Sequence, residues 1–272
     1  GHVDFSYEVS RTLAACEGAI LLVDATQGIQ AQTVAHFRTA KKLNLVMIPV
    51  VNKIDLPNAQ IEMVSKELVD TFGFKRDEIL YISAKTGKNV NLLLEAIAKR
   101  LPPPKGEKDK PLRGLIFDAV YDEFRGVVAY VRIVDGHLNK GDKLKLFQNN
   151  IQTEITDLGF FSPFLVSASS LSTGEIGYVI TGIKDIRQTR VGDTITIQSS
   201  EGIEALPGYK IPKPMVFFGV YPKSTNDYIY LKESLSKLIL NDTALTYTEE
   251  YSSYLGSGFR VGFLGLLHAE IV

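Results

Sequence analysis

The feature that most constrains the fold of this chain is an alternation of apolar strands and amphipathic helices over its first hundred residues. Two uninterrupted apolar runs, 19–24 and 45–51, contain the β-branched residues typical of strands that are buried on both faces. The predicted order is helix 5–16, strand 19–24, helix 32–43, strand 45–51, helix 60–72, strand 79–82 and helix 90–101. This order predicts a parallel sheet covered by helices, whose ligands bind beyond the carboxyl ends of the strands.

A proline- and charge-rich stretch, 102–110, predicts a stiff linker after this first domain. The pattern beyond it consists of short strands separated by turn signals, at 112–121, 127–134, 143–147, 176–180 and 194–197. Short strands at such spacing predict a small antiparallel β-barrel.

A third pattern begins near residue 213. Strand 215–221, helix 227–238, strands 245–249 and 259–263 and the beginning of a helix at 265 follow one another. This order is typical of a split βαβ (ferredoxin-like) domain that lacks its final strand. The predicted fold class is therefore multi-domain, α/β followed by β and then α+β, with domains at 1–104, 111–200 and 211–272.

Composition argues against several classes of protein. The formal charge of −1 provides no global positive field for nucleic acid, and we expect no DNA partner. The one cysteine, Cys16, cannot form an internal disulfide, and the four histidines are too far apart in sequence to suggest a metal site. No run approaches the roughly 18 apolar residues of a membrane-spanning helix.

The sharpest local signal is Asn52-Lys53-Ile54-Asp55, directly after the strand 45–51. A carboxylate at Asp55 can accept two parallel hydrogen bonds, which guanine offers from its ring N1–H and exocyclic amine and adenine does not. The aliphatic stem of Lys53 can cover one face of a base, and the amide of Asn52 can brace a neighbouring loop. Four polar residues after a strand can also be a simple turn, which Pro57 would end.

A second motif, Ser83-Ala84-Lys85-Thr86-Gly87, follows the next strand, and Ser83 lies 28 residues after Asp55. The backbone N–H of Ala84 can donate to a guanine carbonyl, and Lys85 can cover the other face of the base. Ser83 can connect this loop to Asp55. Two such loops after successive strands of one sheet favour a guanine-binding function over two unrelated turns.

These two motifs together resemble the guanine-specificity loops of GTPases. In translational GTPases the γ-phosphate sensor is Asp-Thr-Pro-Gly-His, and Gly1-His2-Val3-Asp4 resembles the end of that element. The resemblance implies that the Gly1 N–H meets the γ-phosphate and that His2 orients the attacking water.

The sequence contains no P-loop, Gly-x-x-x-x-Gly-Lys-Ser/Thr, to hold the β-phosphate and Mg²⁺. We therefore expect a truncated P-loop GTPase domain, inactive as a fragment, within a parent that binds GTP or GDP with Mg²⁺ and hydrolyses GTP. No metal ligand is predicted in the chain itself.

Three later segments resemble the elongation factor 4 (LepA-type) family of translational GTPases most closely. They are 213–217, 240–247 and 258–271. The 28-residue step between the guanine loops leaves no room for the insertion common in elongation factor G. Membership implies the ribosome, with its rRNA and proteins, as partner, and GTP hydrolysis coupled to release of the factor. Location would be cytoplasmic at the ribosome or peripherally at a membrane, or in a mitochondrion or plastid.

Alternative functions remain open at this point. Another translational GTPase, of the BipA or elongation factor G type, would share the guanine loops. A catalytically silent module that docks on ribosomes or proteins is the alternative if Gly1 is the natural start. An ATP-using enzyme conflicts with Asp55, which finds no matching pair of donors on adenine.

Overall fold

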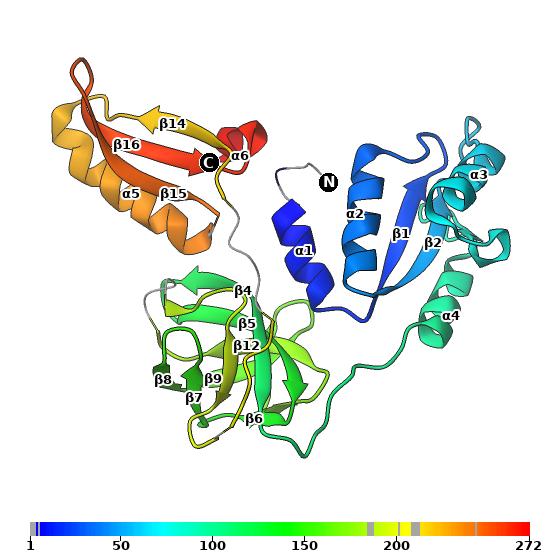
Figure 1. The fold of residues 1–272 in the computed structure, drawn as a ribbon, viewed down its shortest axis with the longest axis horizontal. Coiled ribbons are helices and arrows are strands. Elements are labelled where there is room, and N and C mark those ends of the chain that lie inside the picture. Colours follow the sequence, from blue (N-terminus) through cyan, green and yellow to red (C-terminus); the bar gives the residue numbers. More distant parts are fainter. Residues whose placement is uncertain (1–3, 5, 184–187, 201, 208–212, 243) are drawn as a thin grey trace. The chain divides into compact units, whose positions relative to one another are not determined.

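The computed structural model describes residues 4, 6–183, 188–200, 202–207, 213–242 and 244–272. The chain divides into two compact units, Gly1–Pro103 and Pro104–Val272 (Figure 1). The predicted mixture of α/β structure and antiparallel sheets is confirmed, whereas the division into three domains stays a prediction. Within the described residues, no helix has the length and apolarity needed to cross a membrane.

The first unit contains a parallel sheet in the order β1-β2-β3. Its elements are α1 (Ser6–Ala14), β1 (Gly18–Asp24), α2 (Ala31–Lys42), β2 (Val46–Asn52), α3 (Ile61–Phe72), the short 3-10 helix η2 (Arg76–Glu78), β3 (Leu80–Tyr81) and α4 (Val90–Arg100). Each helix and strand predicted in this region is present, with ends that differ by at most a few residues. The register pairs Gly18 with Val46 and Asp24 with Asn52, so β1 and β2 end side by side.

Helices cover both faces of this sheet. Leu21, Val23 and Val51 pack on one face against a cluster from α2 and α3, in which the rings of Phe37 and Phe72 stack at 4.2 Å. Ile48 and Val50 pack on the other face against α4. Apolar side chains on both faces explain why these strands read as uninterrupted apolar runs in the sequence.

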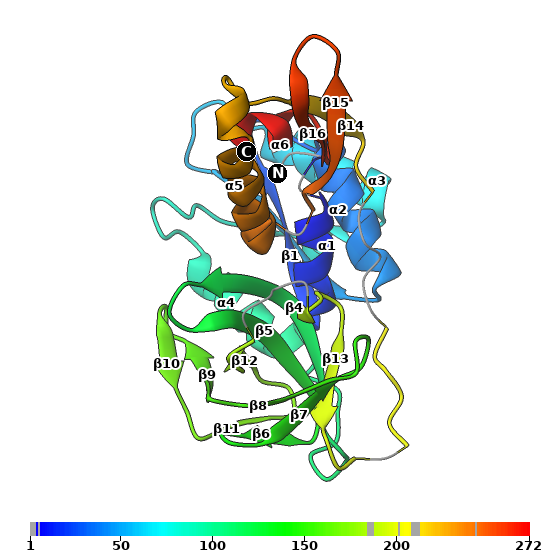
Figure 2. The same cartoon turned by 90° about the vertical axis from the view of Figure 1, so that its left-hand side faces the viewer.

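The second unit begins with an eight-stranded antiparallel sheet in the order β10-β9-β12-β5-β4-β13-β7-β8, with β11 and β6 paired beside it (Figure 2). The strands are β4 (Arg113–Asp122), β5 (Gly126–Asp135), β6 (His137–Asn139), β7 (Lys143–Leu146), β8 (Ile151–Glu154), β9 (Asp157–Phe161), β10 (Leu165–Ser167), β11 (Ser170–Ser172), β12 (Ile176–Ile180) and β13 (Thr194–Ile197). Five of these, β6 and β8 to β11, were not predicted, because each is only three to five residues long.

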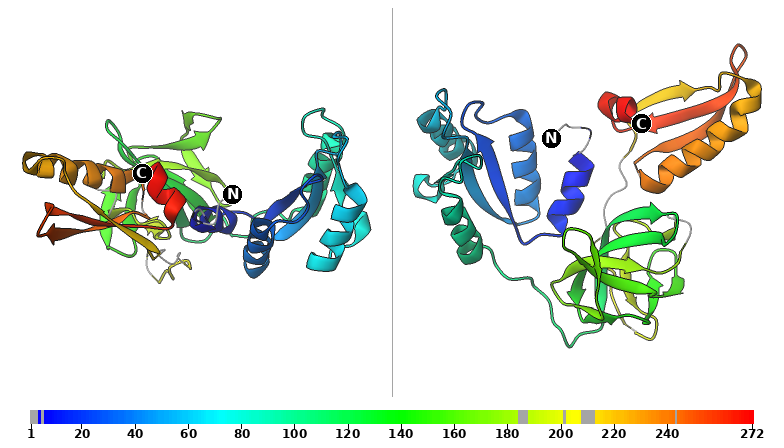
Figure 3. Two further views of the ribbon diagram at one scale, coloured as in Figure 1. Left: turned by 90° about the horizontal axis from the view of Figure 1, so that it is seen from above. Right: turned by 180° about the vertical axis from the view of Figure 1, so that it is seen from behind.

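A three-stranded antiparallel sheet in the order β14-β16-β15 lies in the last part of the chain. Its elements are β14 (Val216–Val220), η4 (Thr225–Asp227), α5 (Tyr228–Asn241), β15 (Thr246–Ser252), β16 (Gly256–Phe263) and α6 (Leu266–Ile271). Leu235 of α5 packs on Phe259 and Val261 of the central strand β16, and α5 runs along this face of the sheet (Figure 3).

His268 holds α6 in place. Its ring is buried, Nδ1 accepts the backbone N–H of Leu264 at 3.0 Å, and Nε2 lies 2.6 Å from the carboxylate of Asp242. Because Nδ1 accepts, Nε2 carries the proton and donates to Asp242.

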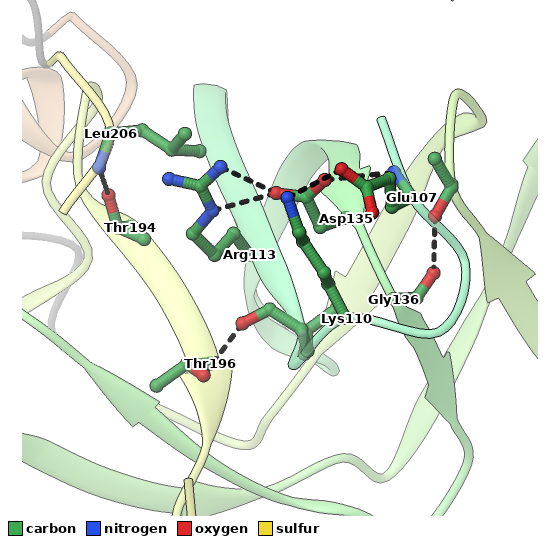
Figure 4. Close-up of polar contacts among 10 residues, drawn as sticks. Glu107, Lys110, Arg113, Asp135, Gly136, Thr194, Thr196 and Leu206 are labelled. Atoms are coloured by element: carbon green, nitrogen blue, oxygen red, sulfur yellow. Dashed lines mark hydrogen bonds and ion pairs between the residues drawn. The ribbon is translucent and has the colours of Figure 1, made fainter. Parts of the chain in front are cut away.

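Asp135 fixes the segment that leads into the antiparallel sheet (Figure 4). One carboxylate oxygen accepts the backbone N–H of Glu107 at 3.0 Å, and the other accepts two N–H groups of Arg113, at 2.6 and 2.8 Å. The hydroxyl of Thr196 donates to the carbonyl of Leu112 at 2.7 Å. The end of the predicted linker is therefore part of the second unit.

Candidate functional site

The two predicted guanine loops lie together at the carboxyl ends of β2 and β3. The side-chain oxygen of Asn52, the last residue of β2, accepts the backbone N–H of Ala84 at 3.0 Å. The backbone N–H of Ile54 reaches the carbonyl of Ile82 at 3.4 Å. Side chains that are distant in sequence therefore share one edge of the sheet, as parallel pairing requires.

Lys53 turns the chain out of β2. Its backbone has φ +66°, a left-handed conformation that is uncommon for a residue with a side chain. Its Nζ lies 2.6 Å from a carboxylate oxygen of Asp24, the last residue of β1. The ammonium is therefore fixed at the end of the neighbouring strand.

Asp24 lies at the same edge of the sheet, and the sequence analysis did not identify it as a candidate site residue. The bond with Lys53 holds the pKa of its carboxyl below the usual range, and burial opposes this shift. Its other oxygen accepts the backbone N–H and the hydroxyl of Thr26, both at 2.8 Å. An acidic residue that ends an apolar strand at the carboxyl edge of a parallel sheet was the signal available in the sequence.

Ser83 organises the second loop from the inside. It is fully buried, its N–H donates to the carbonyl of Lys88, and its own carbonyl accepts the N–H of Gly87. Gly87 adopts φ +79°, which a glycine reaches without strain. The loop is thus a tight turn with its side-chain hydroxyl enclosed.

Asp55 is exposed, and a hydrogen bond from the Ser83 hydroxyl lowers the pKa of its carboxyl. The charge of Lys85, which is also exposed, contributes to the same lowering of the pKa. Asp55 is consequently ionised at neutral pH and free to accept hydrogen bonds from a ligand.

The remaining predicted site residues, Gly1 and His2, lie outside the described residues. Among the residues that the structure does describe, no group of three or more His, Cys, Asp or Glu side chains is arranged to hold a metal ion. The described geometry thus places the exposed carboxylate of Asp55, with Ser83 and Lys85 close to it, at the carboxyl ends of β2 and β3.

Comparison with known proteins matches the chain to two families. Residues 1–103 match the elongation factor Tu GTP binding domain, and residues 126–196 match elongation factor Tu domain 2.

Individual relatives match the whole chain. It is 54% identical over 272 residues to "Elongation factor 4" of Streptomyces coelicolor, 55% identical to that of Chlorobium phaeobacteroides (strain DSM 266) and 53% identical to that of a Hydrogenobaculum species. These matches cover 100% of the chain and 44–45% of each relative. The chain thus spans less than half the length of these curated relatives.

Proposed function

Because the chain belongs to the elongation factor 4 family over its whole length, we propose that it carries the guanine-reading part of a GTP hydrolase that acts on the ribosome. One observation carries this proposal. The Asn52–Ala84 hydrogen bond and the Ser83–Asp55 contact bring the two loops to one sheet edge, with Asp55 exposed and ionised.

In this proposal Asp55 accepts the N1–H and exocyclic amine of guanine. The stems of Lys53 and Lys85 cover the two faces of the base. The N–H of Ala84 already donates to Asn52. The Ala84 N–H would therefore donate to the guanine carbonyl either by sharing its hydrogen between this carbonyl and Asn52 or after its bond to Asn52 breaks.

The phosphate end of the nucleotide is assigned to other residues. Gly1 would present its N–H to the γ-phosphate, and His2 would orient the attacking water. The described residues do not form a site that fits Mg²⁺. Its ligands, and the P-loop, would come from a longer chain, so that the 272 residues alone would not hydrolyse GTP.

The three predicted domains take their proposed roles from the same family. Residues 1–104 would be the later part of the GTPase domain, 111–200 the translation-factor β-barrel, and 211–272 an incomplete split βαβ domain. The match of residues 126–196 to elongation factor Tu domain 2 supports the second assignment. GTP hydrolysis would drive release from the ribosome, its rRNA and proteins, in the cytoplasm or in an organelle.

The test is Asp55→Asn in the full-length protein that carries this sequence. The amide loses one acceptor position and gains a donor, which suits the C2 carbonyl of xanthine. An amide at position 55 leaves a donor of bound guanine without an acceptor, and an unmatched polar group in a binding site costs affinity. We therefore expect the affinity for GDP to fall about tenfold or more and the affinity for xanthosine diphosphate (XDP) to rise. Asp70→Asn, on α3, is the matched control. If Asp55→Asn still preferred GDP over XDP as wild type does, the proposal would be contradicted.

A further inference from the structure

The ion pair between Lys53 and Asp24 is positioned by the backbone at the edge of the sheet. Parallel pairing places Asp24 opposite Asn52, so the first residue beyond β2 lies next to the end of β1. The left-handed backbone of Lys53 then lets the side chain reach over the end of β1, to 2.6 Å from Asp24. Such a short contact between charged groups is a strong, oriented hydrogen bond.

Asp24 is itself held in one orientation. Its first carboxylate oxygen accepts two hydrogen bonds from Thr26, from the backbone N–H and from the hydroxyl. This leaves the second oxygen directed at Lys53. The carboxylate is also largely shielded, because 18% of its side chain is exposed. Lys53 therefore meets a fixed partner and not a mobile surface carboxylate.

A fixed ammonium restrains the carbon chain that leads to it. A lysine side chain has four rotatable bonds and loses much rotamer freedom when it is ordered. Because Asp24, a residue of the protein itself, fixes the Nζ atom, a bound nucleotide need not supply this ordering. Preorganisation of this kind strengthens binding because less freedom is lost in the complex.

We infer that Asp24 is a positioning residue for guanine-nucleotide binding, which holds the stem of Lys53 in the place where it covers one face of the base. The inference rests on the proposed function. Asp24 touches neither base nor phosphate in this arrangement and acts through Lys53 alone. Its contribution must consequently disappear when the stem of Lys53 is absent.

A double-mutant cycle on the full-length protein tests this dependence, with fluorescent GDP as the probe. Asp24→Asn should weaken GDP binding about tenfold, while Asp24→Glu, which keeps the charge, should recover most of the affinity. In a Lys53→Ala background, Asp24→Asn should change the affinity less than about twofold.

The matched control is Glu67→Ala. Glu67 accepts the backbone N–H of Ile29 and so supports the same loop after β1, without an ion pair to Lys53. We expect its GDP affinity to stay within about twofold of wild type. If Glu67→Ala weakens binding as much as Asp24→Asn, or if Asp24→Asn has the same effect with and without the Lys53 stem, the inference is overturned.

The wild-type protein separates this inference from the proposed function. If wild type binds GDP in preference to ADP and Asp24→Asn leaves that affinity unchanged, only the role of Asp24 fails. If wild type shows no preference for GDP over ADP, the proposed function fails, and the role of Asp24 fails with it.

Discussion

The side-chain oxygen of Asn52 accepts the backbone N–H of Ala84 at 3.0 Å, so a single amide holds together two loops that are 32 residues apart. Asn52 can do this because it ends β2, and β2 pairs in parallel with β3, which leads into the second loop. The second loop is thus placed by the protein itself.

Replacing Asn52 by Ala should loosen this connection. Ala84 is an exposed residue, so its N–H can bond to water once the Asn52 amide is gone, and we expect the free energy of unfolding to fall by only about 0.5–1.5 kcal/mol. Hydrogen exchange at the Ala84 amide should accelerate more clearly than at other amides of the first unit. Asn58→Ala, in the exposed turn after the first loop, is the control. Unchanged exchange at Ala84 in Asn52→Ala would contradict the role given to Asn52.

Much of this sheet edge could be anticipated from the sequence. The strands 19–24 and 45–51 are long and apolar, and their buried composition identifies them without tertiary information. The two motifs follow 45–51 and the next predicted strand, 79–82, so parallel pairing of these strands had to bring the motifs to one edge. The contact of Asn52 with Ala84 follows that logic, because the bracing amide and the loop that it braces were both predicted.

Asp24 shows what sequence pattern cannot supply. Its pairing with Lys53 depends on strand register and on a left-handed backbone at a residue with a side chain, neither of which has a reliable sequence signal. The five strands β6 and β8 to β11 could not be predicted for a different reason. Segments such as Ser170–Ser172 are polar and three residues long, and they become strands only because a neighbouring strand supplies hydrogen bonds.

The His268 ring should be a stabilising link in the last part of the chain. It is buried and joins Leu264 to Asp242. His268→Ala would leave the Leu264 N–H and the Asp242 carboxylate without this partner, at a cost of about 1–3 kcal/mol.

Far-UV circular dichroism in urea measures this loss for His268→Ala. His137→Ala is the control, because His137 is exposed and its change should alter stability by less than about 0.5 kcal/mol. Equal stabilities of the two variants would refute the structural role of His268.

Asp135 should protect the linker against proteolysis. Asp135→Asn removes the charge that pairs with Arg113 and weakens the acceptor for the Glu107 N–H. Trypsin should then cleave after Lys105, Lys108 or Lys110 several times faster, since cleavage requires the segment to leave the sheet. Glu123→Gln, in the exposed turn between β4 and β5, should leave the cleavage rate unchanged. Equal cleavage rates in both variants would show that Asp135 does not restrain the linker.

The same carboxylate should make the stability of the second unit depend on pH. Burial alone raises the pKa of Asp135, but the hydrogen bonds from Glu107 and Arg113 and the charge of Arg113 outweigh it, so the folded-state pKa is lowered. The unfolded chain then binds this proton more readily than the folded chain. The stabilisation by Asp135 is complete above the unfolded pKa of about 4 and is lost as pH falls through the folded value.

Wild type should therefore lose its stability advantage over Asp135→Asn as pH falls below about 4. Urea unfolding between pH 7 and pH 3, followed by circular dichroism, measures the difference between the two proteins. Asp193 provides a comparison of opposite sign, because burial raises its pKa despite hydrogen bonds from Gln148 and Thr194. The stability of wild type relative to Asp193→Asn should accordingly improve as pH falls toward 4. If the difference in the free energy of unfolding between wild type and Asp135→Asn were constant from pH 7 to pH 3, protonation of Asp135 would not be linked to folding.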